Sequence, residues 1–588
     1  MLWRLTGLAS ALALVGCAGV ALPPPQHMDI ALLGFNDLHG QLEPPRQSVA
    51  LPTAQGSITL PVGGMAYLAS TLAALKARTP YHAVVAAGDV VGASPMVSAL
   101  FLDEPTIEAL NHMQVDVSAV GNHELDRGWS ELLRLQHGGC APYTARQPCQ
   151  LSPAFAGANF QFLAANIVPE HDGQPPLPAT ALKRFTQGAN TVTVGFIGVT
   201  LRGAPRVVSP AGVRGLYFAD EADTANAQAA RLRAQGADVV VLALHEGGAT
   251  SASVVETSCS GLRGDIVPIL ERLSPAIDVV MSGHTHQAYV CDYASINPAK
   301  PFLLTSAGAY GMWVTDIALR FDLAARRLVH KSARNVAVQN SGYESSAGKV
   351  MPSPLYPSYI PDVGVQAVLE RYRAAAAPLI DKPVGPLAGA VTRHTAPSGE
   401  SALGNLVADA QLWATQSSQA GGAQLSFMHA GGLRADLLPD AQGQVRYGQL
   451  FAVQPFGNHL VVQTLTGAQI RTLLEQQFDP PALPSQRTRV LSVSSGFSYR
   501  YDLSQPPGAR VTAMALHGQP LEDARDYRVV VSSFLAQGGD RYPILTQGRE
   551  VLGGMLDVDA LEGYFQAQGR VVPPLPRRIT RIDTPVSR

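Results

Sequence analysis

Residues 115–128 read VDVSAVGNHELDRG, and this stretch decides the fold. A largely apolar run, typical of a buried strand, passes at once into a turn that carries an amide, an imidazole and two carboxylates. Turn chemistry offers one explanation, because Asn and Asp side chains bond nearby backbone and Asp126 could cap a helix that begins near Trp129. The other explanation is a functional site at the end of a strand, and the rest of the chain favours it.

Five apolar segments before residue 340 end in this way, because Asp, Asn or His follows the last residue of each segment, either directly or after a single glycine. The segments and their endings are DIALLGF (29–35) with Asp37 and His39, AVVAAG (83–88) with Asp89, 115–120 with Asn122 and His123, DVVVLAL (238–244) with His245, and AIDVVMS (276–282) with His284 and His286. Such apolar runs alternate with helical stretches, which indicates layered α/β architecture. Ligands gather at the carboxyl ends of strands in α/β sheets, so the sequence predicts one site built from all five endings.

The residue types at these endings suit divalent metals. Carboxylate, amide oxygen and neutral imidazole are ligands for Zn, Mn, Fe and similar ions. Asp37 and His39 stand two residues apart, as do His284 and His286, so on extended chain each pair points to one side. A single histidine is more often structural, but five endings of this kind together favour a metal site.

The motifs D-x-H, G-D, G-N-H-E-x-D, H-E-G and G-H-T-H, in this order, resemble the calcineurin-like metallophosphoesterase superfamily. Segments after residue 383 narrow the resemblance to the secreted 5′-nucleotidase family, which includes UDP-sugar hydrolases and 2′,3′-cyclic-nucleotide phosphodiesterases. The resemblance implies an α/β fold in which residues 29–345 form a four-layer α/β/β/α sandwich. Residues 383–588 would form an α+β substrate-binding domain. Between them, residues 346–382 read as a Pro-rich linker followed by a helix that Asp362 caps.

The resemblance also implies two divalent metal ions, Zn, Mn or similar, with Asp89 bridging them. One ion would be held by Asp37, His39, Asp89 and His286, and the other by Asp89, Asn122, His245 and His284. His123 and Asp126 resemble the catalytic dyad of the family, in which the Asp orients and charges the His. The resemblance implies no role for Glu124 or Glu246. We expect Glu124 at the surface or behind the metal ligands, and Glu246 in contact with solvent.

The implied reaction is hydrolysis of nucleotides, 5′-nucleoside monophosphates first, to nucleoside and phosphate. Two cations screen the charge of the phosphate and lower the pKa of a bound water, so that a metal-bound hydroxide attacks phosphorus. His123 would stabilise charge on the transferring or leaving group. The alternatives are a 2′,3′-cyclic-nucleotide phosphodiesterase, a UDP-sugar or NAD pyrophosphatase and, from a different class, a non-catalytic nucleotide-binding surface lipoprotein.

The second domain contains motifs that the family uses to bind substrate. In HAGGLRADL (429–437) His429 stands where the family commonly has Asn. Arg434 ends the glycine-rich part of this motif, and its guanidinium suits phosphate oxygens. Two phenylalanines are implied to sandwich the base, and an Asp to contact the ribose. The expected substrate residues are Arg393, His429, Arg434, Phe456, Asn458, Phe534 and Asp540. Arg541 follows this Asp, where it either disturbs the turn or adds a phosphate contact.

The first 17 residues resemble a bacterial lipoprotein signal. Arg4 precedes an apolar stretch, residues 5–15, that is too short to span a bilayer and leads to Leu14-Val15-Gly16-Cys17. The mature chain would begin at a lipidated Cys17, followed by a tether over residues 18–28. The alternative is an ordinary secretory signal, and either kind of signal would export the protein. We expect a periplasmic or cell-surface lipoprotein. In a host with two membranes we expect it at the outer membrane, because an Asp directly after the lipidated cysteine often retains lipoproteins at the inner membrane, and Ala18 stands at that position here.

Four further cysteines, Cys140, Cys149, Cys259 and Cys291, form an even set in an exported chain, which indicates disulfides. Three connectivities are possible, and local closure favours Cys140–Cys149 and Cys259–Cys291. The alternative, a site of thiolate zinc ligands, lacks a C-x-x-C spacing.

Size and charge limit the classes of partner. A chain of 588 residues exceeds one ordinary core, so two or more domains are expected, and 46% apolar with 15% charged residues is typical of a globular protein. The net charge of −2 shows no excess of positive charge that would bind a phosphate backbone, so we do not expect long nucleic acid as a partner. The expected partners are a nucleotide and, through Cys17, a membrane; no pattern indicates an oligomeric state.

Overall fold

The computed structural model describes residues 27–53, 56–144, 146–171, 177–208, 212–345, 348–478 and 490–583. The expected signal segment, the lipidation site Cys17 and nearly all of the tether lie outside the described residues. Within the described ranges, no helix combines the length and the apolar composition needed to cross a membrane.

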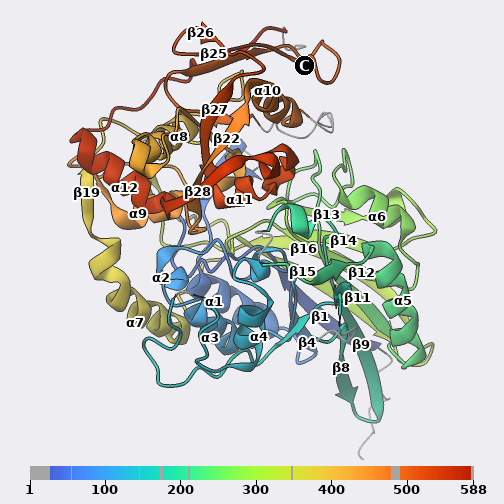
Figure 1. Cartoon of the computed structure of the whole chain (residues 1–588). Helices are drawn as coiled ribbons and strands as arrows, with labels where there is room; N and C mark the ends of the chain where they lie inside the picture. Colours follow the sequence, from blue (N-terminus) through green and yellow to red (C-terminus); the bar gives the residue numbers. More distant parts are fainter. Residues whose placement is uncertain are drawn as a thin grey trace, which may run out of the picture.

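The N-terminal part is a sandwich of two six-stranded sheets (Figure 1). The first sheet has the order β16-β15-β1-β4-β5-β6, with β1 at His27–Phe35, β4 at His82–Ala86, β5 at Val117–Ala119, β6 at Gln161–Leu163, β15 at Trp313–Asp322 and β16 at Arg327–Ala337. The second has the order β13-β14-β12-β11-β9-β8, with β8 at Thr180–Gln187, β9 at Asn190–Thr200, β11 at Val239–His245, β12 at Val279–Ser282, β13 at Ala288–Asp292 and β14 at Leu303–Ala307. All five apolar segments singled out in the sequence are strands. In the first sheet β1, β4 and β5 run parallel, and in the second β11 and β12 run parallel.

Helices cover the two outer faces of this sandwich. A core between the sheets joins side chains such as Ile30 and Val241. The outer face of the first sheet packs against α1 (Met65–Lys76), α3 (Glu104–His112) and α4 (Trp129–His137), and that of the second against α5 (Glu221–Ala234) and α6 (Ile266–Arg272). The expected four-layer α/β/β/α sandwich is therefore confirmed.

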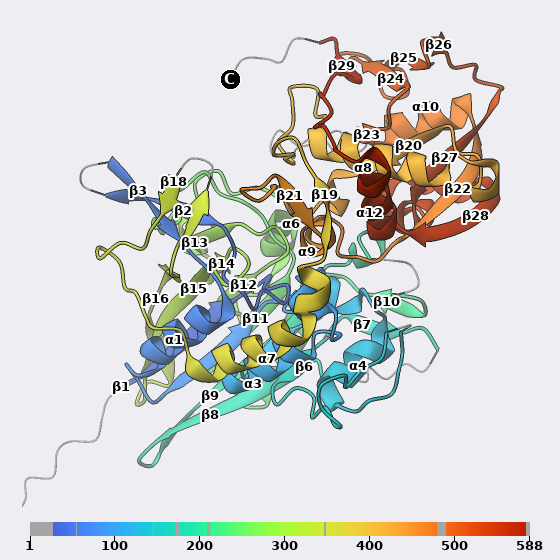
Figure 2. The same ribbon diagram turned by 90° about the vertical axis from the view of Figure 1, so that its left-hand side faces the viewer.

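The helix expected in the linker is α7 (Val363–Ile380), and the Asp362 side chain caps it by accepting hydrogen bonds from two backbone N–H groups, as predicted. Figure 2 shows α7 lying across α1 and α3. Buried Leu369 and Tyr372 anchor it, and the Tyr372 hydroxyl donates a hydrogen bond to Glu108 of α3 at 2.7 Å. The helix is thus docked on the N-terminal sandwich along its length rather than free in solvent.

The C-terminal part is a separate α+β unit, as expected. Its five-stranded sheet has the order β23-β20-β27-β22-β28, with β20 at Leu425–Met428, β22 at His459–Thr466, β23 at Ser492–Val493, β27 at Asp526–Ser532 and β28 at Arg549–Leu556. A four-stranded sheet has the order β26-β25-β24-β29, with β24 at Phe497–Tyr501, β25 at Val511–Leu516, β26 at Gln519–Pro520 and β29 at Ile579–Arg581. The helices are α8 (Ala402–Thr415), α9 (Tyr447–Val453), α10 (Gly467–Gln476), α11 (Ser533–Ala536) and α12 (Asp557–Gln568).

Short elements complete the described chain. They are helix α2 (Met96–Ala99), the hairpins β2 (Ser48–Thr53) with β3 (Gly56–Pro61) and β17 (Tyr343–Ser345) with β18 (Gly348–Val350), and the pairs β7 (Ile167–Pro169) with β10 (Leu216–Phe218) and β19 (Pro383–Pro386) with β21 (Gln444–Arg446). Single 3₁₀ turns that matter below are η1 (His123–Leu125), η2 (Ala204–Arg206), η5 (Ala430–Gly432) and η6 (Gly539–Arg541).

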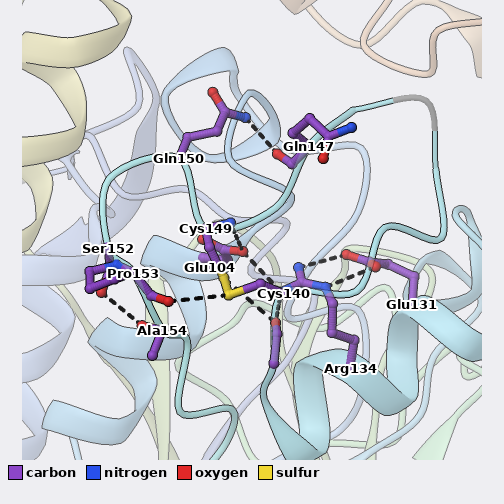
Figure 3. Close-up of a disulfide and its surroundings, with 11 residues drawn as sticks. Glu104, Glu131, Arg134, Cys140, Gln147, Cys149, Gln150, Ser152, Pro153 and Ala154 are labelled. Carbon is purple, nitrogen blue, oxygen red and sulfur yellow. Dashed lines mark hydrogen bonds and ion pairs between the residues drawn. A yellow bond between two sulfur atoms is a disulfide. The ribbon is translucent and has the colours of Figure 1, made fainter.

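The four cysteines of the described chain form the two local disulfides, Cys140–Cys149 and Cys259–Cys291. Figure 3 shows the first of them beside a buried charge cluster, in which Arg134 bonds Glu104 at 2.9 Å and Glu131 at 2.7 Å. The Cys149 backbone N–H donates to Glu104 at 2.9 Å. The disulfide therefore closes a loop that is also fastened to the helices beneath it.

Candidate metal centre and substrate pocket

The endings of the five strands meet at one edge of the sandwich, although the strands belong to two different sheets. All seven expected metal ligands gather there. Asp37, His39, Asp89, Asn122 and His245 are each at most 1% exposed, while His284 and His286 are partly exposed. Three overlapping groups of candidate ligand atoms share this place. The first has Asp37, His39 and His286, the second has Asp89, His245 and His284, and the third has His39, Asp89 and His123.

The first group is built on the loops after β1 and β12. Nε2 of His39 lies 2.9 Å from Nε2 of His286, and Asp37 Oδ1 lies 3.4 Å from the same His286 nitrogen. Nδ1 of His39 lies 3.0 Å from the Gly92 carbonyl oxygen. Since that carbonyl can only accept, Nδ1 carries the hydrogen and Nε2 turns its lone pair toward the group.

The second group lies between the sheets. Nε2 of His245 is 3.0 Å from Asp89 Oδ2 and 3.1 Å from Asn122 Oδ1, and Nδ1 of His284 is 3.0 Å from the same Asn122 oxygen. Nδ1 of His245 faces the Ala87 carbonyl oxygen at 2.8 Å, so its Nε2 also presents a lone pair. Asp89 connects the two groups, because its Oδ2 also lies 3.8 Å from Nε2 of His39.

This donor set fits two divalent cations. Acceptor atoms and lone pairs face one another at hydrogen-bond distance, which is unfavourable unless a cation lies among them. Burial lowers the pKa of His39 well below its usual value and, together with the charge of His245, lowers that of His284 to about 3. Burial also lowers the pKa of His245, but the charge and hydrogen bond of Asp89 outweigh it and raise the pKa to about 10. A positive charge is therefore favoured between His245 and Asp89.

The backbone of the centre is held in an unusual conformation. Five of the seven candidate ligands have positive φ, with Asp37 at 50°, His39 at 49°, Asp89 at 53°, His284 at 71° and His286 at 57°. Non-glycine residues rarely adopt this region, and such strain clusters at functional sites. The close approach of the loops also requires glycine, since a Cβ at Gly121 would lie 2.2 Å from Asp89 Oδ1.

His123 and Asp126 form a hydrogen-bonded pair beside this centre, with Nδ1 2.8 Å from Asp126 Oδ2. Burial lowers the pKa of His123, but the negative charges of Asp126 and Asp89 outweigh it, so the net pKa lies above the usual value. Asp126 does not cap the following helix α4, whose N-cap is Gly128. The turn-chemistry explanation for this aspartate is therefore wrong.

Glu124 lies behind the ligands, one of the two places expected for it, whereas Glu246 lies deeper than expected. Glu124 is 3% exposed and accepts hydrogen bonds from the N–H groups of Asp89, Val90 and Gly121, at 2.9, 2.7 and 2.6 Å. It ties the loop after β4 to the loop after β5 and so positions Asp89. Glu246 is 8% exposed and bonds the Gly247 N–H at 2.9 Å, which corrects the expectation that it lies in solvent. The one sequence feature that pointed to a role for Glu124 is its position two residues after the candidate ligand Asn122.

The metal centre opens into a cavity of about 260 Å³ between the two domains. Side chains from both domains line it. They are Asn122, His123, Asp126, Val207 and His284 from the N-terminal sandwich, and His429, Gly431, Arg434, Phe456, Asn458, Phe534 and Asp540 from the C-terminal unit. Six of the seven expected substrate residues are therefore in one cavity with the expected dyad. Val207 and Gly431 carry no chemical signal in the sequence and were not anticipated.

The aromatic rings of the cavity stack on histidines. Phe456 stacks on His123, with centroids 5.8 Å apart and an interplanar angle of 17°, and the guanidinium of Arg434 lies over the Phe456 ring at 5.8 Å. Phe534 stacks on His429 at 5.2 Å and 29°. Nδ1 of His429 also lies 3.3 Å from Asp540 Oδ2. His429 thus belongs to the cavity even though the family commonly has Asn there.

Arg393 is the exception among the expected substrate residues, because it does not line the cavity. Its guanidinium pairs with Asp436 at 3.3 Å, and 45% of its side chain is exposed. Arg393 is the nearest arginine before the pair Glu400-Ser401, and in the family that the sequence resembles a substrate arginine usually precedes such a pair. The Glu400 carboxylate is fully buried and accepts a hydrogen bond from Asn405 at 2.6 Å.

Comparison with known proteins places this architecture in a class. Residues 30–288 match the family model described as calcineurin-like phosphoesterase, and residues 382–547 match that of the 5′-nucleotidase C-terminal domain. The fold and the site therefore define a metal-dependent phosphoester hydrolase. The chain belongs to the calcineurin-like phosphoesterases that carry a 5′-nucleotidase C-terminal domain, as the motifs predicted.

Individual relatives cover most of the chain. It is 29% identical to "Endonuclease YhcR" of Bacillus subtilis over 92% of its own length, but it spans only 40% of that relative. It is 25% identical to a "Probable 5'-nucleotidase" of Treponema pallidum, covering 91% of this chain and 90% of the relative. The structure of a 5′-nucleotidase precursor from Thermus thermophilus superposes with a TM-score of 0.71 at 24% identity, covering 95% of this chain and 100% of that one, and so has the same fold.

Proposed function

We propose that the protein hydrolyses nucleotides, 5′-nucleoside monophosphates first, to nucleoside and inorganic phosphate. The observation that carries this proposal is the shared cavity, in which the candidate metal centre and the aromatic rings of the second domain face the same space. A nucleotide has the matching parts, a dianionic phosphate at one end and a flat base at the other. The Treponema relative, named a probable 5′-nucleotidase, supports the same substrate class.

Seven side chains would hold two divalent ions, with Asp89 shared. They are Asp37, His39, Asp89, Asn122, His245, His284 and His286. When bound, such ions screen the negative charge of a phosphate ester and make water a stronger nucleophile at neutral pH.

The other side chains bind and orient the substrate. Asp126 accepts a hydrogen bond from Nδ1 of His123, which fixes the ring and favours its protonated form for contact with phosphoryl oxygens or the leaving oxygen. Arg434 offers a guanidinium to the phosphate. Phe456 and Phe534 offer flat surfaces to the base, and Asp540 accepts from ribose hydroxyls.

A substrate screen in which the products are identified by chromatography tests the proposal directly. Purified protein, stripped of metal and resupplied separately with Zn, Mn, Co or Mg, is offered 5′-AMP, 2′,3′-cyclic AMP, UDP-glucose and NAD. The proposal expects 5′-AMP to give the highest kcat/KM. If only the cyclic nucleotide is turned over, the protein is a phosphodiesterase, and if only UDP-glucose or NAD is turned over, it is a pyrophosphatase. Binding of nucleotides without any turnover would favour the non-catalytic nucleotide-binding lipoprotein.

Replacing Phe534 with Ala should weaken the binding of nucleotides but not the binding of phosphate esters that lack a base. Loss of one stacking surface costs about 1–3 kcal/mol per base, so the Michaelis constant for AMP should rise about 5- to 150-fold, while that for p-nitrophenyl phosphate stays nearly constant. The aryl phosphate is the control, because it presents the same phosphate without a base. Equal losses for both compounds in steady-state kinetics would remove Phe534 from the base site.

We also propose that the protein is exported and anchored by lipid at Cys17, at the periplasmic or cell surface and at the outer membrane of a host with two membranes. The lipobox-like sequence before this cysteine supports the proposal. Replacing Cys17 with Ala should move the protein from the membrane to the soluble fraction and abolish labelling by radioactive palmitate. Unchanged labelling of the variant would refute the anchor.

A further inference from the structure

A second hollow, of about 700 Å³, adjoins the cavity that holds the expected base-binding residues, here called the nucleoside cavity. The two spaces meet at Val207 and His284, which line both. Because His284 is a candidate metal ligand, the second hollow also borders the candidate metal centre. A 5′-nucleoside monophosphate whose base lies in the first cavity has no atoms left to occupy the second.

Three arginines from separate parts of the chain line this hollow. Arg206 ends η2, Arg263 lies in the loop before α6, and Arg541 ends η6 of the C-terminal domain. The first two are exposed, and in the part of the chain that the structure describes neither has an ion-pair partner. Arg541 reaches across the domain boundary to Asp265, but at 3.9 Å this pair is weak. Two guanidinium groups without carboxylate partners that line one hollow suit an anion, above all a phosphate.

The remaining lining leaves room for a ligand. Gly247, Gly248 and Gly264 form part of the wall, so backbone rather than side chains faces the space. A Cβ at Gly247 would lie 2.2 Å from the Gly283 carbonyl oxygen, which shows how closely the loops around the centre pack there. Of the two acids in the lining, Glu246 is buried with a bond to the Gly247 N–H, and Asp265 faces Arg541. Neither acid therefore pairs with Arg206 or Arg263, although Nη1 of Arg263 donates a hydrogen bond to the Gly261 carbonyl oxygen at 3.1 Å.

We propose that this hollow is a second phosphate subsite, which binds an anionic group carried on the far side of the scissile phosphate. The proposal rests on the proposed function, since it uses the same centre and the same nucleoside cavity. The ligand class is a nucleotide whose 5′-phosphate is esterified to a further phosphorylated group, such as a short 5′-phosphorylated oligonucleotide. The Bacillus relative named an endonuclease is consistent with a diester at such a centre.

The bond that breaks is the one to the nucleoside in the first cavity. The oxygen of one water joins phosphorus, the 5′-oxygen of that nucleoside leaves with a proton, and the group in the hollow keeps the phosphate. The dinucleotide pApA would thus give adenosine and adenosine 3′,5′-bisphosphate, and ApA would give adenosine and adenosine 3′-phosphate.

The test compares pApA with ApA, which lacks only the terminal phosphate. We expect the Michaelis constant for pApA to be at least about tenfold lower, because a charge-assisted phosphate contact contributes about 1.5–3 kcal/mol. In the double variant Arg206→Gln/Arg263→Gln, the ratio of the two Michaelis constants should fall to near one. Arg202→Gln is the matched control, because Arg202 is an exposed arginine just before η2 that does not line the hollow, and it should keep the wild-type ratio.

Equal Michaelis constants for pApA and ApA in the wild-type protein would overturn the subsite, and so would a double variant that keeps the full preference. Binding measurements separate this outcome from failure of the proposed function. In the His123→Ala variant, whose turnover is slowed about 10²–10⁴-fold, dissociation constants for the two dinucleotides can be measured by calorimetry. A tenfold preference for pApA supports the subsite even if 5′-AMP is not hydrolysed, and equal binding refutes it even if 5′-AMP is a substrate.

Discussion

Replacing His123 with Ala lowers kcat for 5′-AMP by about 10²–10⁴-fold, the range for loss of a positioned acid or electrostatic group. The reason is its place in the cavity, next to the candidate ligands yet held by Asp126 at 2.8 Å. Because the ring itself is not among the expected ligands, the metal content of the variant should equal that of the wild type. Steady-state kinetics and elemental analysis on the same preparation measure both quantities.

A matched control is His137→Ala, since His137 is an exposed histidine at the end of α4, away from the cavity. It should leave kcat unchanged. Asp126→Asn should give an intermediate loss, because the imidazole remains while its negatively charged partner is gone. If His123→Ala turns over 5′-AMP at the wild-type rate, the dyad has no part in the reaction.

The variant Asp89→Asn should lose activity by at least about 10³-fold, equivalent to roughly 4 kcal/mol of transition-state stabilisation. Asp89 lies between both candidate ligand groups, 3.0 Å from His245 and 3.8 Å from His39. Asn keeps the size of the side chain but removes the charge that two cations would share. We therefore expect bound metal to fall from about two ions to one or fewer per chain, measured by plasma mass spectrometry.

Asp223→Asn is the control for this change, because Asp223 is an exposed acid on α5 whose side chain pairs only with Arg272 among the described residues. It should retain both metal and activity. Circular dichroism of Asp89→Asn should match the wild type, so that a loss of metal is not a loss of fold. A variant with two bound ions and normal turnover would show that Asp89 is not shared between them.

The convergence of the candidate metal ligands could be predicted from the sequence, because each of them has a local signal. Each expected ligand closely follows an apolar run, and the carboxyl ends of buried strands meet by the geometry of α/β sheets. The sequence does not show that β1 and β11 belong to different sheets, since that depends on which strands pair. It still places Asp37 and His245 correctly, because the two sheets pack face to face with their ligand-bearing ends at one edge.

Residues that act through tertiary contacts could not be predicted in the same way. A glutamate is usually exposed, and the burial of Glu124 becomes favourable only because loops after two strands direct N–H groups at its carboxylate. The stacking of Phe456 on His123 joins two domains and leaves no local pattern. Arg393 illustrates the opposite error, since closeness in sequence to a motif does not fix where a side chain on a loop points.

The central claim is that Asp37, His39, Asp89, Asn122, His245, His284 and His286 together hold a pair of divalent ions on which turnover depends. Titrating stripped protein with Zn or Mn, while following bound metal by plasma mass spectrometry and phosphate release from 5′-AMP, tests it most directly. We expect activity to return in parallel with binding and to saturate at about two ions per chain. Full phosphate release from protein without detectable metal would contradict the claim.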